Sequence, residues 1–161
     1  MARFVVQQHD ATTRHFDLRL EVGGVLRSWA VPKGPSLDPA DKRLAMAVED
    51  HSMAAGEFEG RRPDAPRGSG AVIVWDEGEW EPLDGGDAAA ALDSGHLAFR
   101  ARGRKLRGGW ALTRVARERG GRERWILVKV RDDEADRERD LVADEPASVR
   151  TGRTLDELAG H

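Results

Sequence analysis

The sequence predicts a mainly β fold, a closed or nearly closed β-barrel with one or two short flanking helices. Short apolar or alternating segments recur along the chain, glycine-rich turns separate them, and one stretch has the composition of a helix. The 161 residues correspond to a single domain. The expected strands are 4–6, 15–21, 25–31, 44–48, 71–76, 79–82, 96–103, 108–115 and 125–130.

The first strands form a predicted hairpin. Residues 15–21 alternate polar and apolar side chains, which is the pattern of a strand with one buried face. Gly23-Gly24 follows as a hairpin signal, and residues 25–31 return. The apolar residues 4–6 open a short strand before this hairpin. We therefore expect a short strand followed by a hairpin at the start of the chain.

A stiff turn separates this hairpin from the next strand. Pro32 to Pro35 hold Lys33 between a proline and a glycine, which suits a group with a fixed position but is also common in turns without a function. Residues 44–48 then form a strand that ends at residues 49–51. The Gly-rich, Pro-rich and charged stretch 54–70 is either a lid or a flexible loop.

The second half contains a central strand and the helix. Residues 71–76 are continuously apolar up to Asp76, and Glu77-Gly78 predicts a turn into residues 79–82. The alanine-rich segment 87–92 is the helix candidate, and Ser94-Gly95 ends it.

The remaining strands alternate again and carry aromatic residues. The five tryptophans fall on or beside the expected strands, where we expect them to fill the barrel rather than to stack on bases. His96 stands apart from the other histidines and is expected at the surface, while the terminal His161 carries no information.

The most informative motif is His-x5-His-x-Asp, formed by His9, His15 and Asp17. Two imidazoles and a carboxylate can bind a first-row metal and leave coordination positions open. Arg19 shares the strand face of His15 and Asp17, so it could grip an anionic oxygen that the metal holds. A solvated polar strand face is the alternative for such a pattern. His51, which follows another apolar segment, favours a shared site.

Composition limits the function classes. With no cysteine, a metal site must use nitrogen and oxygen ligands. No apolar run has the length of a bilayer span and the N-terminus lacks a signal-peptide pattern, so we expect a cytoplasmic protein. The net charge is −3, yet residues 99–117 are basic and residues 132–145 are mainly acidic. The basic stretch is either a local face for a phosphate backbone or an ordinary solvated surface.

A set of ordered motifs resembles the 3'-phosphoesterase module of bacterial and archaeal DNA ligase D. The resemblance spans nearly the whole chain, and motifs of this number and order are specific. They are Phe4–His9, His15–Glu21, Ser28–Pro39, Lys42–Ala45, Val48–His51, Phe58–Gly60, Gly70–Asp76, Gly78–Trp80, Arg104–Gly108, Trp110–Leu112 and Trp125–Lys129. We expect a stand-alone chain, with the barrel domain in residues 1–145 and a tail in residues 146–161 that resembles the segment leading toward a ligase domain.

The resemblance implies an active-site groove and a Mn2+-dependent activity on DNA 3' ends, with Co2+ and Zn2+ as other candidate metals. A terminal ribonucleoside would be removed to leave a 3'-phosphate, which would then be hydrolysed to a 3'-hydroxyl. Position by position, the resemblance assigns metal binding to His9, His15 and Asp17, the grip on the scissile phosphate to Arg19 and His51, and support or phosphate contact to Gln7, Lys33, Arg43 and Glu49.

The same resemblance gives the expected partners. The substrate would be a primer-template 3' end carrying a ribonucleotide or a phosphate, and a ligase, a polymerase and Ku would act with it in end joining. We expect a monomer that acts at DNA ends in the nucleoid, with no membrane association.

Three departures from the family bear on this assignment. Ala55 stands where the family often has a tyrosine, residues 64–68 replace a glycine- and tyrosine-bearing loop, and the usual N-terminal arm is missing before the first strand. The first two affect the diesterase step or its substrate preference, and the third affects the monoesterase step. Two alternatives remain: a DNA-end-binding module without turnover, which would need only the cationic groups, and the same chemistry on RNA ends.

Overall fold

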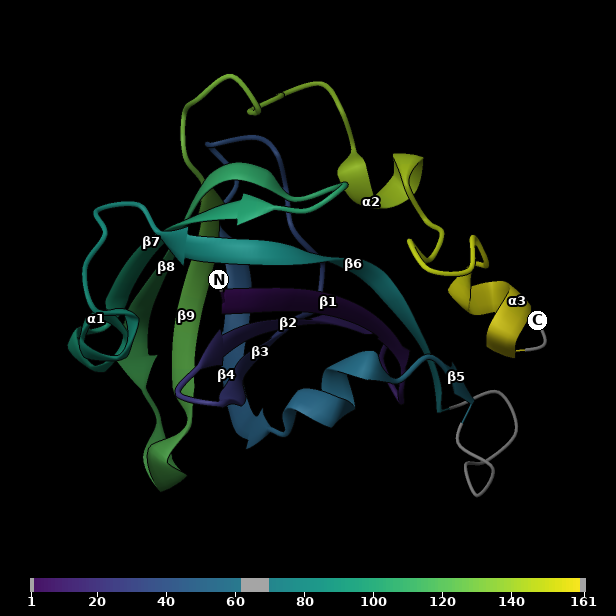
Figure 1. Ribbon diagram of the computed structural model, residues 1–161, viewed down its shortest axis with the longest axis horizontal. Coiled ribbons are helices and arrows are strands. Elements are labelled where there is room, and N and C mark those ends of the chain that lie inside the picture. Colours follow the sequence, from purple (N-terminus) through teal and green to yellow (C-terminus); the bar gives the residue numbers. More distant parts are fainter. Residues whose placement is uncertain (1, 62–69, 160–161) are drawn as a thin grey trace.

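The computed structural model describes residues 2–61 and 70–159, and the statements below concern these residues. They contain nine strands in a single antiparallel sheet (Figure 1). The strands are β1 (Ala2–Asp10), β2 (His15–Val22), β3 (Val25–Val31), β4 (Arg43–His51), β5 (Gly60–Arg61), β6 (Ala71–Pro82), β7 (His96–Arg102), β8 (Arg107–Arg117) and β9 (Glu123–Lys129). No helix in the described part of the chain is long and apolar enough to cross a membrane.

The sheet closes into a barrel, which confirms the predicted fold class. The strand order is β1-β2-β3-β4-β9-β8-β7-β6-β5, and β1 pairs with β6 as well as with β2. Eight of the described strands therefore form the barrel. The short strand β5 pairs with the first two residues of β6. Closure removes the unpaired edges that an open sheet would expose.

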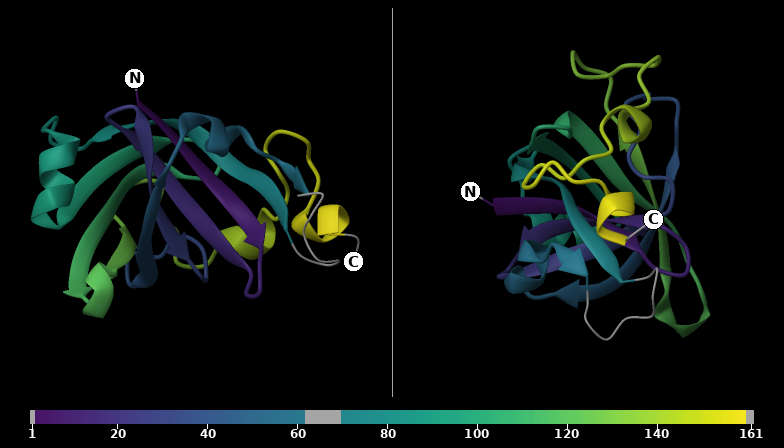
Figure 2. Two further views of the ribbon diagram at one scale, coloured as in Figure 1. Left: turned by 90° about the horizontal axis from the view of Figure 1, so that it is seen from below. Right: turned by 90° about the vertical axis from the view of Figure 1, so that its right-hand side faces the viewer.

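Short helical segments lie outside the barrel. They are the 3-10 segments η1 (Met53–Glu57) and η2 (Arg119–Gly121), and the α-helices α1 (Ala88–Ser94), α2 (Leu141–Asp144) and α3 (Leu155–Ala159). Helix α1 confirms the predicted helix: Asp87 caps its first N–H groups, and Gly95 ends it in the left-handed conformation. Helices α1 and α3 lie at opposite ends of the long axis in Figure 1 and in the left view of Figure 2.

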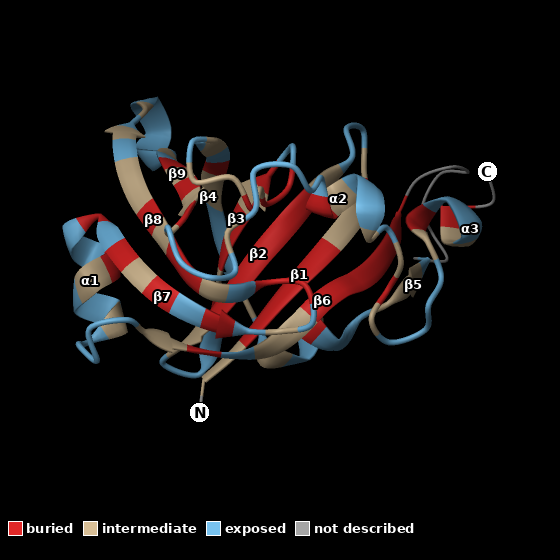
Figure 3. Cartoon of the chain, turned by 90° about the horizontal axis from the view of Figure 1, so that it is seen from above, coloured by how far each residue is buried: buried red, intermediate tan, exposed pale blue. Residues whose placement is uncertain are grey.

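The barrel interior is aromatic, as predicted. All five tryptophans belong to the buried core and are at most 2 % exposed. Trp29 and Trp125 pack edge to face with ring centroids 5.7 Å apart, and Trp80 packs in the same way on Phe99. Figure 3 shows the resulting alternation of buried and exposed residues along β7. These large rings fill the centre of the barrel, so ligands must bind outside it.

The structure corrects the predicted turn at Glu77-Gly78. Strand β6 runs unbroken through both residues, and Gly78 pairs with Phe4 on β1. A Cβ atom at Gly78 would overlap the carbonyl oxygen of Arg102, where β7 passes close to β6. The glycine therefore permits a close approach of two chains and does not form a turn.

Other boundaries also differ from the prediction. Strand β1 extends on both sides of residues 4–6, and β4 includes residues 49–51, which were expected to follow the strand. The predicted loop 54–70 begins with η1 and β5. The expected loop change at residues 64–68 lies outside the described residues, as does His161.

The close approach at Gly78 gives a stability prediction. Gly78→Ala should lower the free energy of unfolding by about 1–3 kcal/mol, because the methyl group forces the β6 and β7 backbones apart. Urea unfolding followed by tryptophan fluorescence measures this loss. Gly86→Ala is the matched control, because its Cβ would approach only the flexible carboxylate of Asp84. Equal stability of the two variants would contradict the account.

Candidate metal and phosphate site

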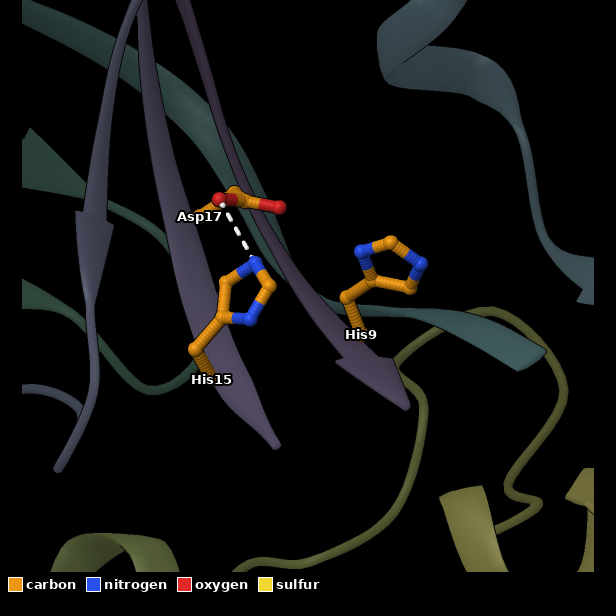
Figure 4. A group of neighbouring side chains, drawn as sticks. All are labelled: His9, His15 and Asp17. Atoms are coloured by element: carbon orange, nitrogen blue, oxygen red, sulfur yellow. Dashed lines mark ion pairs between the residues drawn. The ribbon is translucent and has the colours of Figure 1, made fainter. Parts of the chain in front are cut away.

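The residues of the His-x5-His-x-Asp motif meet on two neighbouring strands. In the antiparallel pair β1 and β2, His9 lies opposite His15, and Gln7 lies opposite Asp17. Directly opposed residues in a sheet point to the same face. The loop 11–14 is therefore a short connection that brings both histidines to one end of the barrel wall (Figure 4).

This face is the outer surface of the barrel. The alternate residues Phe4, Val6, Phe16 and Leu18 belong to the interior core, so Gln7, His9, Asp17 and Arg19 point outward. Segment η1 covers part of this face: a Cβ at Gly56 would contact Val5 and Leu26. Covering by η1 explains how polar residues outside the barrel become buried.

Three donor groups lie close enough to share one ion. The candidate ligand atoms of His9, His15 and Asp17 all lie within 4.8 Å of one another. The His15 Nε2 atom is 3.2 Å from Asp17 Oδ1. Figure 4 marks this pair with a dashed line. Two ligand atoms at about 2.1 Å from one ion and at right angles to each other would be separated by about 3 Å.

The surroundings of His15 also fit a metal ligand. Its Nδ1 atom lies 3.1 Å from the carbonyl oxygen of Thr13, which accepts a hydrogen bond and leaves Nε2 directed at Asp17. Metal-binding histidines commonly donate their second ring N–H to a carbonyl in this way. The hydrogen bond with Asp17 raises the pKa of His15 above its ordinary value. The group as a whole fits an ion bound through nitrogen and oxygen.

Arg19 is the centre of the hydrogen-bond network beside these ligands. Its side chain is 8 % exposed and contacts Asp17 on the same strand. Its partners are Gln7 Oε1 at 2.7 Å from Nε, Ser28 Oγ at 2.9 Å and His51 Nδ1 at 3.1 Å from Nη1, and Asp17 Oδ2 at 3.4 Å from Nη2. These contacts fix the plane of the guanidinium.

The arrangement leaves Arg19 able to bind an anion. Burial lowers the pKa of Arg19, and the nearby Asp17 carboxylate opposes this effect. Arginine remains charged over the physiological range even after such a shift. Of its five N–H groups, one on Nη2 has no partner among the described residues. The same Nη2 atom contacts Asp17, which is one of the candidate metal ligands.

His51 approaches Arg19 from β4. The register between β3 and β4 shifts after Val48, so that His51 lies opposite Leu26 on the outer face. Its Nδ1 atom is 2.8 Å from the Glu49 carbonyl oxygen as well as 3.1 Å from Arg19. The Nδ1 atom either donates to the Glu49 carbonyl or accepts from Arg19, and in both cases Nε2 is left for a bound group. Glu49 therefore contributes a main-chain oxygen here, and no hydrogen bond or ion pair of its carboxylate occurs in the described structure.

Gln7 ties the network to the segment above it. Its Nε2 group donates to the carbonyl oxygens of Ala55 and Phe58, at 3.1 and 3.0 Å. Its Oε1 atom accepts from Arg19. One side chain thus links the guanidinium to both ends of the turn that forms the pocket wall.

These residues line a pocket of about 350 Å³. The polar lining residues are Gln7, His9, Asp17, Arg19 and His51, and the apolar ones are Val48, Ala55, Phe58 and Val72. Ala55 contributes a methyl group and a carbonyl oxygen to the lining of this pocket. A second pocket of about 410 Å³ lies beside it, shares Val48, and includes Glu49 in its lining.

Lys33 and Arg43 do not line either pocket. Lys33 is exposed just after β3, and Arg43 begins β4, so both stand at the barrel end that carries His15. Arg43 pairs with the core residue Leu127, and its Nε atom is buried without a hydrogen-bond partner among the described residues. The structure therefore groups six of the nine predicted site residues tightly, with Glu49 adjoining through its backbone.

Two contributions were not predicted from the sequence. Ser28 holds the Arg19 guanidinium, and the carbonyl groups of Ala55 and Phe58 hold Gln7. A signal for Ser28 existed, because the hairpin at Gly23-Gly24 places it directly opposite Arg19. Nothing in the sequence indicates the contacts of Gln7 with the two carbonyl groups, because these contacts depend on how η1 folds over the sheet.

The basic stretch 99–117 lies elsewhere. Its strands β7 and β8 belong to the wall across the barrel from β2. There Arg102 pairs with Glu81, and Arg104 donates to the Val149 carbonyl. This stretch is therefore not a continuation of the pocket.

Comparison with known proteins points to one family. The family described as "DNA Ligase D 3'-phosphoesterase domain" matches residues 7–114. The chain is 51% identical over 158 residues to the "Multifunctional non-homologous end joining protein LigD" of Pseudomonas aeruginosa, which covers 96% of this chain and 18% of that protein. It is 37% identical over 116 residues to the corresponding Mycobacterium tuberculosis protein, covering 72% of this chain and 15% of that protein. The chain thus spans less than a fifth of either relative.

The position of Gln7 gives a prediction that needs no substrate. Gln7→Glu should lower the free energy of unfolding by about 1–3 kcal/mol at neutral pH, because a carboxylate oxygen replaces the N–H groups that face two carbonyl oxygens. Chemical denaturation measures the loss. Gln8→Glu is the control, because this neighbouring side chain is half-exposed and makes no hydrogen bond in the described structure. A variant at position 7 as stable as the control would contradict the assigned network.

Proposed function

The chain belongs to the DNA ligase D 3'-phosphoesterase family, and from this premise we propose that it is a Mn2+-dependent hydrolase that processes DNA 3' ends. In the proposed sequence of reactions, a terminal ribonucleoside is removed to leave a 3'-phosphate, and the phosphate is then hydrolysed to a 3'-hydroxyl. The observation that carries the proposal is a charged, buried Arg19 beside a His/His/Asp ligand group, two members of which, His9 and Asp17, line the same pocket as Arg19.

The metal would be held by His9, His15 and Asp17. An ion bound there supplies a Lewis acid that withdraws charge from a phosphoryl oxygen. Ligands of this type accept several first-row ions, so Co2+ and Zn2+ are the alternatives to Mn2+. Asp17 has a second role in the proposal, because its other oxygen contacts Arg19 and opposes the lowering of the Arg19 pKa by burial.

Arg19 would bind the scissile phosphate. Its Nη2 atom contacts Asp17 and has one further N–H, so a phosphoryl oxygen bound near Asp17 could accept a hydrogen bond from Arg19. The contacts of Arg19 with Gln7 and Ser28 hold the guanidinium before substrate arrives. A fixed cation stabilises the charge that develops on the phosphoryl oxygens without having to reorganise.

His51 would serve the leaving oxygen. Because its Nδ1 atom contacts the Glu49 carbonyl, the protonated ring presents Nε2–H to the pocket. In the diester step, water adds to phosphorus, the bond to the ribonucleoside oxygen breaks, and that oxygen takes a proton. In the monoester step, the 3'-oxygen leaves in the same way and inorganic phosphate is released. His51 is the proposed proton donor in both steps.

Lys33 and Arg43 would contact flanking phosphates. They stand at the barrel end that carries His15 but outside the pocket, so a longer nucleic acid could reach them. Such contacts position the strand and add affinity without sequence preference. In cells we propose that the substrate is a DNA end under repair, with a ligase, a polymerase and Ku as partners in the cytoplasm.

The activity test uses metal-free protein and two 5'-labelled primer-templates, one ending in a ribonucleotide and one in a 3'-phosphate. With Mn2+ added, both should be converted to 3'-hydroxyl ends, and His9→Ala should abolish both conversions. His96→Ala is the matched control. This exposed histidine on β7 contacts Thr113, and β7 is not a neighbour of β1 or β2, which carry the candidate metal ligands. DNA binding without conversion would support an end-binding module, and conversion of matched RNA ends alone would support the RNA alternative.

Arg19→Lys tests the role of the guanidinium. Lysine can replace the charge but not the four simultaneous contacts, so kcat/KM should fall about 10²–10³-fold. Steady-state kinetics with the 3'-phosphate substrate measure this loss. Arg102→Lys, an exposed arginine paired with Glu81 on the opposite wall, should change kcat/KM less than twofold. An Arg19→Lys enzyme with wild-type kinetics would exclude Arg19 from the mechanism.

A further inference from the structure

The C-terminal segment 146–159, which we call the strap, packs against the barrel beside the pocket. The Val149 N–H donates to the Val74 carbonyl at 3.1 Å, and Leu155 and Ala159 belong to the buried core. Figure 2 shows the strap, in yellow, at the end of β6. Helix α3 contacts β1, β5 and β6. The strap is therefore attached to the strands that flank the site.

Arg150 of the strap binds the turn that forms the pocket wall. Its Nε and Nη2 atoms donate to both carboxylate oxygens of Glu77 on β6, each at 2.7 Å. Nη2 also donates to Glu57 Oε2 at 2.7 Å, and Nη1 donates to the Glu57 carbonyl oxygen at 3.1 Å. The hydrogen bonds from Arg150 lower the pKa of both Glu57 and Glu77. One guanidinium thus joins η1 to a rigid barrel strand.

A second set of strap contacts holds the next acidic residue. The hydroxyl groups of Ser148 and Thr151 donate to the two oxygens of Glu59 at 2.6 and 2.5 Å. Glu59 Oε1 also accepts from the Val74 N–H at 2.8 Å. Glu57 and Glu59 flank Phe58, whose carbonyl accepts from Gln7. The wall segment 55–59 is therefore held by the strap on one side and by Gln7 on the other.

We propose that Arg150 is a positioning residue for the pocket, and that the strap belongs to the catalytic unit. This inference rests on the proposed function. Arg150 acts through Glu57 and the wall segment on Gln7, and Gln7 sets the orientation of Arg19. Arg150 itself is not among the residues that line the pocket. Its removal would leave the metal ligands in place and loosen the wall above Arg19.

A comparison with Arg3 separates the effect of a positive charge near the two carboxylates from the effect of the hydrogen bond to the η1 backbone. Arg3 also bridges Glu57 and Glu77, but only through their carboxylates. Arg150 alone of the two donates to the backbone of η1. Loss of Arg150 therefore leaves a positive charge beside both carboxylates and removes the bond that fixes the turn itself. The effect expected from Arg150 is one of geometry.

The test compares Arg150→Ala with Arg153→Ala, because Arg153 is an exposed strap arginine whose side chain makes no hydrogen bond or ion pair in the described structure. Hydrogen exchange of peptides covering 53–59 should be at least tenfold faster in Arg150→Ala and unchanged in Arg153→Ala. The kcat on the 3'-phosphate substrate should fall about tenfold or more, while the Mn2+ dissociation constant stays within twofold. Arg150→Lys, which keeps one donor group, should recover part of kcat.

The outcomes separate this inference from the proposed function. If Arg150→Ala fails to fold, Arg150→Met, which keeps the apolar part of the side chain and removes every donor, should give the same faster exchange and lower kcat. Unchanged exchange and kcat in a folded variant would overturn the positioning role. A large loss of Mn2+ affinity would also overturn it, because the metal ligands would then depend on Arg150. An inactive wild-type protein would contradict the proposed function, while the exchange comparison would still test the strap.

Discussion

The buried guanidinium of Arg19 is the constraint on which the rest of the site depends. A charge that is almost removed from water must be paired and hydrogen-bonded, or its burial is strongly unfavourable. Asp17 supplies the counter-charge, and Gln7 and Ser28 supply neutral acceptors. The same Asp17 is a candidate metal ligand through its other oxygen. The carboxylate of Asp17 is therefore both the counter-charge of the guanidinium and a candidate metal ligand.

The barrel makes this arrangement possible by its register. Antiparallel pairing places Gln7 opposite Asp17 and Ser28 opposite Arg19, so three strands contribute to one outward patch. The aromatic interior keeps those strands fixed, because five buried tryptophans leave the barrel filled. Segment 55–59 covers this patch, and the segment itself has few contacts with the core. Its anchors are Gln7 beneath it and the C-terminal strap beside it.

Sequence alone could predict the parts that follow from local rules. Strand alternation and the Gly23-Gly24 signal indicated the first hairpin, which the structure confirms. The motif spacing indicated His9, His15 and Asp17 as a ligand group, and their ligand atoms lie within 4.8 Å of one another. Gly78 was interpreted as part of a turn. Glycine occurs both in turns and where two backbones approach closely, and the sequence does not distinguish these cases. The strap contacts could not be predicted, because Arg150 and Glu57 are 93 residues apart and the pairing depends on the closed barrel.

A crystal structure of the protein with Mn2+ and inorganic phosphate tests the central claim most directly. The account predicts an anomalous peak for manganese between His9, His15 and Asp17, and a phosphate oxygen within hydrogen-bond distance of Arg19 Nη2. Arg19 should keep its contacts with Gln7 and Ser28 unchanged, because it is held in place before the anion binds. Manganese bound elsewhere, or phosphate bound without Arg19, would contradict the claim that one carboxylate joins a metal site to an anion-binding guanidinium.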